Sequence, residues 1–167
     1  MRLLKAAFLC SVLAITGGRA AAAELPAGAD GGAPLWAKRC GKDGDGRELC
    51  YVEQYAMAMP ANTMLLNVMI GFVGPEGKPR MIMTAPLGIM LMPGLVMTVD
   101  SGKPLTLPLE SCQPGGCRTV ADLDPSGLDQ LRRGTRMTVR FVTGDGKALD
   151  IPVPLTGLDA ALKQLKR

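Results

Sequence analysis

Methionine is the residue type whose spacing could do chemistry in this chain. Nine of the eleven methionines lie between Met57 and Met97, and several are two residues apart. In a strand such side chains project from one face, and clustered thioethers are soft ligands that select Cu(I). The candidate ligands of a periplasmic Cu(I)-binding carrier are Met81, Met83, Met90 and Met92. The favoured interpretation is that methionine fills irregular core space, because no histidine or free thiolate would assist a metal.

The cysteines form a second set of reactive side chains. Cys40, Cys50, Cys112 and Cys117 predict two disulfides in an exported chain, with three pairings open. The local pairs are favoured, because one pair flanks a Gly- and Asp-rich loop and the other flanks a short Gln-Pro-Gly-Gly turn. A zinc site made of the same thiolates is the alternative, but the spacings do not form paired C-x-x-C knuckles.

A further metal hypothesis concerns the sequence Asp-Gly-Asp-Gly-Arg-Glu at residues 43–48. The fragment resembles the start of an oxygen-ligand calcium loop, but it lacks the later acidic positions and the terminal bidentate glutamate. A turn closed by a disulfide explains it equally well. We therefore predict that the protein uses no metal or other cofactor.

Catalytic machinery is scarce in the sequence. The chain has no histidine, which removes the commonest general base and the usual metal ligand. After residue 23 the serines are Ser101, Ser111 and Ser126, and none lies in a nucleophile elbow. No Gly-rich loop leads into a helix with a phosphate-binding lysine. We predict that the protein is not an enzyme.

The amino-terminal segment predicts export. Residues 1–5 carry two basic side chains, residues 6–15 are apolar and residues 20–23 are all alanine. This order is typical of a signal peptide, here residues 1–23, and the apolar run is too short to span a bilayer. Residues 24–35 are rich in Gly, Ala and Pro and predict a flexible arm. Residues 36–167 predict a single β-rich domain.

Cleavage after residue 23 would change the net charge of the chain, and export predicts its cellular location. The mature chain would keep 16 basic and 15 acidic residues, with no run of basic residues and few aromatics, so we exclude nucleic-acid binding. No other apolar run is long enough to span a bilayer, so we expect no transmembrane segment. Export together with disulfides predicts a periplasmic location, with outer-membrane association or secretion as alternatives.

The hydrophobic pattern predicts an all-β fold. Strands are expected at residues 48–55, 64–73, 80–85, 95–100, 103–109, 136–143 and 149–155. The clearest alternation places Met137, Val139 and Phe141 on one face, and Leu149, Ile151, Val153 and Leu155 are expected to share a face of the last strand.

Prolines predict where two of these strands lie in their sheets. Pro104 and Pro108 in one strand, and Pro152 and Pro154 in another, remove backbone donors along a single side of each strand. Both strands should therefore be edges, which indicates an antiparallel β-sandwich with open edges.

Two short helices complete the prediction. Asp124 is a good N-cap before Pro125, and Gly134 should end that helix. Near the C-terminus, Leu158, Ala161, Leu162 and Leu165 recur at helical spacing.

Several segments together resemble the invasion-associated locus B family of exported bacterial proteins. They are Trp-Ala-Lys-Arg-Cys at residues 36–40, Pro-Leu-Gly-Ile-Met-Leu-Met-Pro-Gly at 86–94, Val-Asp-Ser-Gly at 99–102, Cys-Gln-Pro-Gly-Gly-Cys at 112–117 and the closing segment 153–162. The family more often has Phe where this chain has Leu158, and it is less rich in methionine.

The resemblance implies a β-rich protein of the bacterial periplasm or envelope, linked to host-cell invasion in pathogenic members. It carries over no catalytic residues. We expect a non-enzymatic protein that acts through contacts with an envelope or host protein. Trp36, Tyr51 and Tyr55 are candidates for an interaction patch, although packing in the core is the favoured interpretation of these aromatics.

Overall fold

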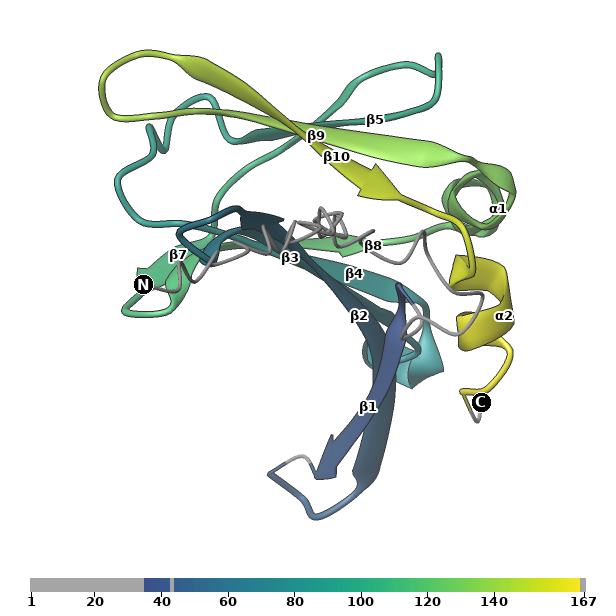
Figure 1. The fold of residues 1–167 in the computed structure, drawn as a ribbon. Helices are drawn as coiled ribbons and strands as arrows, with labels where there is room; N and C mark the ends of the chain where they lie inside the picture. Colours follow the sequence, from purple (N-terminus) through teal and green to yellow (C-terminus); the bar gives the residue numbers. More distant parts are fainter. Residues whose placement is uncertain (1–34, 43, 166–167) are drawn as a thin grey trace, which may run out of the picture. The chain divides into compact units, whose positions relative to one another are not determined.

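The computed structural model describes residues 35–42 and 44–165, and these form two antiparallel sheets with two short helices (Figure 1). The larger sheet has the order β1 (Ala37–Lys42), β2 (Glu48–Ala58), β3 (Thr63–Gly71), β4 (Arg80–Ala85), β8 (Gly116–Asp122), β7 (Ser111–Gln113). The smaller sheet has the order β10 (Ala148–Pro154), β9 (Arg136–Val142), β5 (Leu95–Val99), β6 (Leu105–Leu107). The predicted fold class is confirmed. The predicted signal peptide and the arm before Leu35 lie outside the described residues.

The inner faces of both sheets share one hydrophobic core. In β9, Met137, Val139 and Phe141 are buried, as their alternation predicts. The apolar run of β3 has Leu66, Val68 and Ile70 fully buried, with less buried residues between them. Each strand therefore places one face in the core.

The proline-containing strands are the two edges of the smaller sheet, as predicted. β6 is flanked by Pro104 and Pro108, and β10 contains Pro152 and Pro154. One of the four residues expected to share a buried face of β10 is not buried. Leu149 is 37% exposed, because it lies next to the β9–β10 turn, whereas Ile151 and Val153 reach the core.

Both helices lie at one end of the sheets, which we call the helix end (Figure 1). α1 (Pro125–Arg133) begins after Asp124, whose carboxylate accepts a hydrogen bond from the backbone N–H of Gly127 at 2.6 Å. α2 (Leu158–Leu162) buries Leu158 and Leu162 and is tied to α1 by an Arg132–Asp159 ion pair. Within residues 35–42 and 44–165, no helix has the length and apolar character needed to cross a bilayer.

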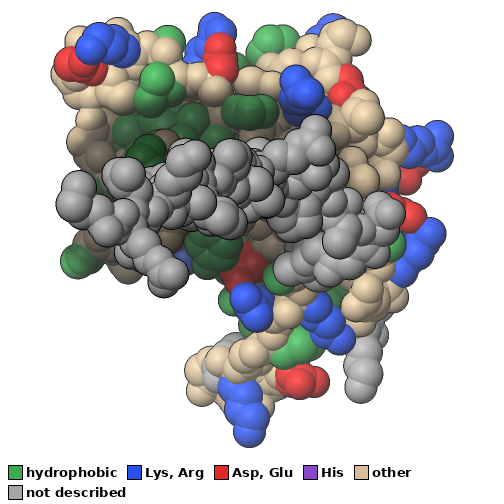
Figure 2. All heavy atoms as spheres, in the orientation of Figure 1, with side chains coloured by type: hydrophobic (Ala, Val, Ile, Leu, Met, Phe, Trp, Pro, Cys, Tyr) green, Lys and Arg blue, Asp and Glu red, His purple; other side chains and the backbone are tan. Residues whose placement is uncertain are grey.

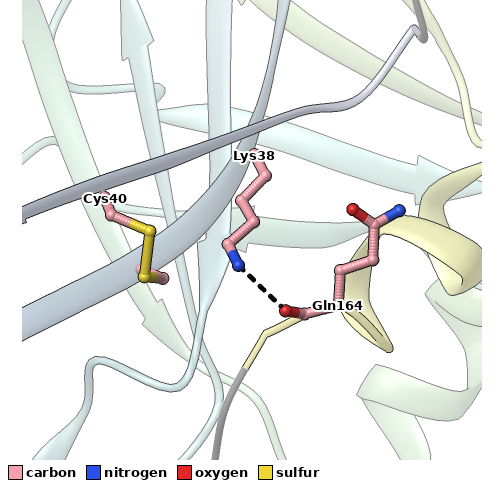
Figure 3. Close-up of a disulfide and its surroundings, with 4 residues drawn as sticks. Lys38, Cys40 and Gln164 are labelled. Atoms are coloured by element: carbon pink, nitrogen blue, oxygen red, sulfur yellow. Dashed lines mark hydrogen bonds between the residues drawn. A yellow bond between two sulfur atoms is a disulfide. The ribbon is translucent and has the colours of Figure 1, made fainter.

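The local disulfide pairs favoured by loop length are present. Cys40 is bonded to Cys50 across the β1–β2 hairpin, and Cys112 is bonded to Cys117 across β7–β8, with Cα–Cα distances of 4.1 and 4.0 Å. Each bridge joins directly opposed residues of two antiparallel strands. Close to the first bridge, Lys38 Nζ donates a 3.1 Å hydrogen bond to the carbonyl of Gln164, which ties β1 to the segment after α2 (Figure 3).

Candidate functional site

The end of the sheets opposite the helices carries the connecting loops, and we call it the loop end. The pairing of Asn67 with Thr84 places the β2–β3 turn beside the end of β4, where residues 86–94 cross to the smaller sheet. The β7–β8 turn lies there too, because Cys117 pairs with Ala85. Both sheets therefore contribute loops to this end.

The crossing segment 86–94, here called the apolar loop, exposes large hydrophobic side chains. Leu87 is 55% exposed, Met90 44%, Leu91 54% and Met92 97%. Met59 in the β2–β3 turn, also at the loop end, is 76% exposed. Exposed apolar side chains grouped on one segment make it a candidate interaction surface.

Backbone hydrogen bonds fix the apolar loop against the β9–β10 hairpin. The N–H of Met90 donates to the carbonyl of Val142 at 2.8 Å, and the N–H of Gly144 donates to the carbonyl of Gly88 at 2.7 Å. Between these bonds Ile89 forms a bridge with Thr143 and is buried. The loop is thus anchored from within while its other apolar side chains point outward.

Glycines allow the two bends of the apolar loop. Gly88 has φ +82° and Gly94 has φ +66°, a region that side chains other than glycine rarely adopt. A Cβ at position 94 would also collide with the carbonyl oxygen of Leu107. The bends therefore require glycine, and they present a fixed apolar surface.

The four methionines proposed as Cu(I) ligands do not form one accessible site. Met81 and Met83 project from β4 into the core and are at most 1% exposed. Met90 and Met92 lie in the apolar loop, outside the strands, so the shared face that residues two apart have in a strand does not apply to this pair. The strand-like spacing is interrupted because the backbone bends at Gly88 and Gly94. The structure therefore supports the core-filling role for the first pair and a surface role for the second.

The three aromatic residues considered for an interaction patch also differ in how far they are buried. Trp36 is 2% exposed and packs in the core, so it is not part of a surface patch. Tyr51 is half-buried, and Tyr55 is 50% exposed on β2. The three residues do not form one exposed patch.

Glu53 is a polar residue whose role the sequence pattern did not reveal. It is 7% exposed; Arg39 Nε donates to its Oε1 at 2.8 Å, and the hydroxyl of Tyr55 donates to its Oε2 at 3.2 Å. Burial, and then the negative charge of Glu53, raises the pKa of Tyr55 above its ordinary value. The three side chains form a structural network on the face of β1 and β2.

Where the structure describes them, the cysteines proposed for zinc are bonded in disulfides, and Asp45 of the calcium-like fragment is paired with Arg47. Among the described residues, the one group of acidic and sulfur ligands close enough to share an ion is Cys40, Glu48 and Cys50, and both of its sulfurs belong to a disulfide. The other two cysteines of the zinc hypothesis are also bonded to each other. In the calcium-like fragment, Asp43 lies outside the described residues and Asp45 pairs with Arg47 at 3.2 Å. The fragment forms the turn of the disulfide-bonded β1–β2 hairpin.

Comparison with known proteins gives a family and a fold. A family model described as "Invasion associated locus B (IalB) protein" matches residues 36–166. The crystal structure of invasion associated protein B from Bartonella henselae is similar, with a TM-score of 0.69 and 22% sequence identity over 78% of this chain and 90% of that chain. No curated protein matches the sequence. At that identity the structural likeness establishes the fold alone, whereas the family model spans most of the chain.

Proposed function

Because the chain belongs to the invasion associated locus B family, we propose that it is an exported, non-enzymatic protein of the bacterial cell envelope that acts by binding another protein. The partner is an envelope protein or, as the name of the family implies, a protein of a host cell. Two disulfides support an extracytoplasmic location, since such bonds persist in oxidising compartments. The periplasm is the proposed compartment.

The apolar loop is the observation that carries this proposal. Leu87, Met90, Leu91 and Met92 are exposed on a segment whose backbone is already fixed by β9. A surface that is ordered before binding loses little conformational freedom on association, which favours affinity. Methionine adapts its shape to an irregular apolar partner surface. A protein with a complementary apolar pocket fits this loop.

Site-specific photocrosslinking in the producing bacterium tests the proposal. A benzophenone amino acid replaces Met92 in the apolar loop, and a matched control places it at exposed Ser101 in the β5–β6 turn of the helix end. We expect a discrete protein adduct from position 92 and none of the same mass from position 101. Adding Leu91→Ser to the position-92 chain should abolish the adduct while the melting temperature stays unchanged. The same adduct from both positions, or one that survives Leu91→Ser, would contradict the proposal.

A further inference from the structure

A groove opens along the side of the molecule, between the edge strand β10 and the neighbouring strands β2 and β3. Its volume is about 320 Å³, within the range of small-ligand sites. The walls are mainly apolar and are formed by Gln54, Tyr55, Ala56, Met57, Leu65 and residues 150–154. In the space-filling view, hydrophobic side chains are visible near the β9–β10 hairpin (Figure 2).

Gln54 is a polar lining residue of this groove that has an unpartnered atom. The residue is 8% exposed, and its Oε1 is one of two buried side-chain atoms in the described residues that lack a hydrogen-bond partner. A buried acceptor without a donor is costly, so native proteins rarely keep one without a reason. The other such atom, Thr119 Oγ1, does not line the groove. Gln54 therefore offers an acceptor to an occupant that brings a donor.

The exposed edge of β10 also offers acceptors. Backbone groups of alternate residues point to the same side of a strand, and the N–H of Leu155 donates to the carbonyl of Thr135, the residue before β9. Residues 150, 152 and 154 consequently direct their backbone groups away from β9. Pro154 follows this rule, because its carbonyl accepts from Trp36 Nε1 at 3.1 Å. Pro152 directs its carbonyl the same way and has no N–H to offer.

The groove carries no unbalanced charge. Asp150, its acidic lining residue, receives two 2.7 Å hydrogen bonds from the guanidinium of Arg140. A groove on the opposite side, near β6 and α1, has a similar volume of about 330 Å³, but neither of the two unpartnered buried atoms lines it. The first groove thus selects for a neutral, apolar occupant with hydrogen-bond donors.

We propose that this groove binds an extended apolar peptide segment of a partner protein, whose backbone N–H groups donate to Gln54 Oε1 and to the carbonyl of Pro152. An extended peptide presents one N–H on a given side at every second residue and alternates its side chains, so it can bring donors to the acceptors and apolar groups to the walls. Residues 150–154 span about 13 Å, so four or five peptide residues would occupy the groove. An alkyl chain would leave the Gln54 oxygen without a donor.

Fluorescence polarisation with a defined peptide tests the proposal on the full mature chain. The probe is fluorescein-Leu-Thr-Val-Thr-Leu-amide, compared with three versions that carry one backbone N-methyl group at the second, third or fourth residue. We expect methylation of the N–H that donates to Gln54 Oε1 to weaken binding about tenfold, the factor that corresponds to 1.4 kcal/mol. Gln54→Leu should abolish that difference, whereas Gln113→Leu on the exposed β7 should preserve it.

The position of binding is read from methyl NMR signals. The methyl groups of Ile151 and Val153 should shift on titration, and those of Ile89 at the loop end should not. Equal affinities for all four peptides, or no binding at millimolar concentration, would overturn the proposal. Tighter binding of dodecanoate to Gln54→Leu than to the wild type would also overturn it and indicate a lipid chain. Because the groove and the apolar loop are separate surfaces, failure here leaves the photocrosslinking result unaffected.

Discussion

The indole nitrogen of Trp36 donates a hydrogen bond to the carbonyl oxygen of Pro154 across 3.1 Å, which joins residues 118 positions apart in the sequence. Trp36 precedes β1 of the larger sheet, and Pro154 ends the edge strand β10 of the smaller one. The bond therefore links the two sheets directly. The accepting carbonyl of Pro154 lies on the outer edge of β10, where no neighbouring strand of the sheet pairs with it.

This link predicts a graded response to substitution at position 36. Trp36→Phe removes the donor and should lower the free energy of unfolding by about 1 kcal/mol or slightly more. Trp36→Ala also leaves a cavity in the core and should cost about 3–5 kcal/mol. Because the chain has a single tryptophan, urea unfolding should be followed by circular dichroism. A Trp36→Phe variant as stable as the wild type would show that the hydrogen bond contributes nothing to stability.

The acid side of the stability profile should depend on Asp100. Its carboxylate accepts hydrogen bonds from the backbone N–H of Arg136 at 3.0 Å and from the N–H and hydroxyl of Thr135, and these bonds lower its pKa below the usual value. A lowered folded-state pKa contributes stability above the unfolded value of about 3.9, and this contribution is lost as the pH falls through the folded value.

Asp100→Asn should therefore lower the melting temperature at pH 7, and its difference from the wild type should shrink below about pH 4. Asparagine tolerates the left-handed backbone at this position, where φ is +48°. Asp129→Asn in α1 controls for the loss of one negative charge. A difference that stays constant from pH 7 to pH 2 would contradict the assignment.

The two disulfides should differ in how readily they are reduced. Cys40 is exposed and Cys50 is half-buried, in a part of the β1–β2 hairpin that extends past the last residue of β3 paired with β2. Cys117 is 2% exposed in the core. Limited reductant followed by alkylation and peptide mapping should therefore label Cys40 and Cys50 first. The opposite order would contradict the burial of Cys117.

Replacing each disulfide by serines should separate local from global stability. Cys112→Ser with Cys117→Ser should lower the free energy of unfolding by about 2–3 kcal/mol. Cys40→Ser with Cys50→Ser should mainly increase hydrogen exchange within the β1–β2 hairpin. Hydrogen exchange read residue by residue distinguishes the two patterns. A uniform increase over both sheets in the second variant would contradict the local role of the Cys40–Cys50 bridge.

Mild peroxide should reveal the two classes of methionine. Met92 and Met59 are 97% and 76% exposed, so they should form sulfoxides first. Met81, Met83 and Met137 are at most 1% exposed and should stay reduced while the fold persists. Peptide mapping by mass spectrometry gives the order, and circular dichroism confirms that the protein remains folded. Similar rates for Met83 and Met92 would contradict the separation of the pairs.

Local sequence patterns correctly predicted the strands and the helix start that short-range interactions determine. Pro152 and Pro154 marked an edge strand because a side of a strand that lacks these N–H groups cannot form a regular ladder with another strand of the sheet. Asp124 predicted the start of α1 because its carboxylate accepts from an N–H three residues away. The alternation of β9 was sufficient because that strand has one face in the core.

The remaining features depend on contacts between distant parts of the chain. β8 has a weak pattern of its own and forms by pairing with β4. The apolar loop has strand-like spacing, but its bonds to β9 hold it in a different conformation. The burial of Glu53 becomes apparent only when Arg39 is placed beside it. The position of Gln54 in a groove likewise depends on how β10 lies against β2.

The apolar loop is also the place where the chain first passes from the larger sheet to the smaller one. A cut between residues 86 and 94 would yield a fragment with β1–β4 and another with the whole smaller sheet, both helices and β7–β8. Each fragment would retain its own disulfide, and the two would meet through the β4–β8 ladder. The fold therefore lends itself to reassembly from two separately expressed halves, with the proposed binding loop as the cut site.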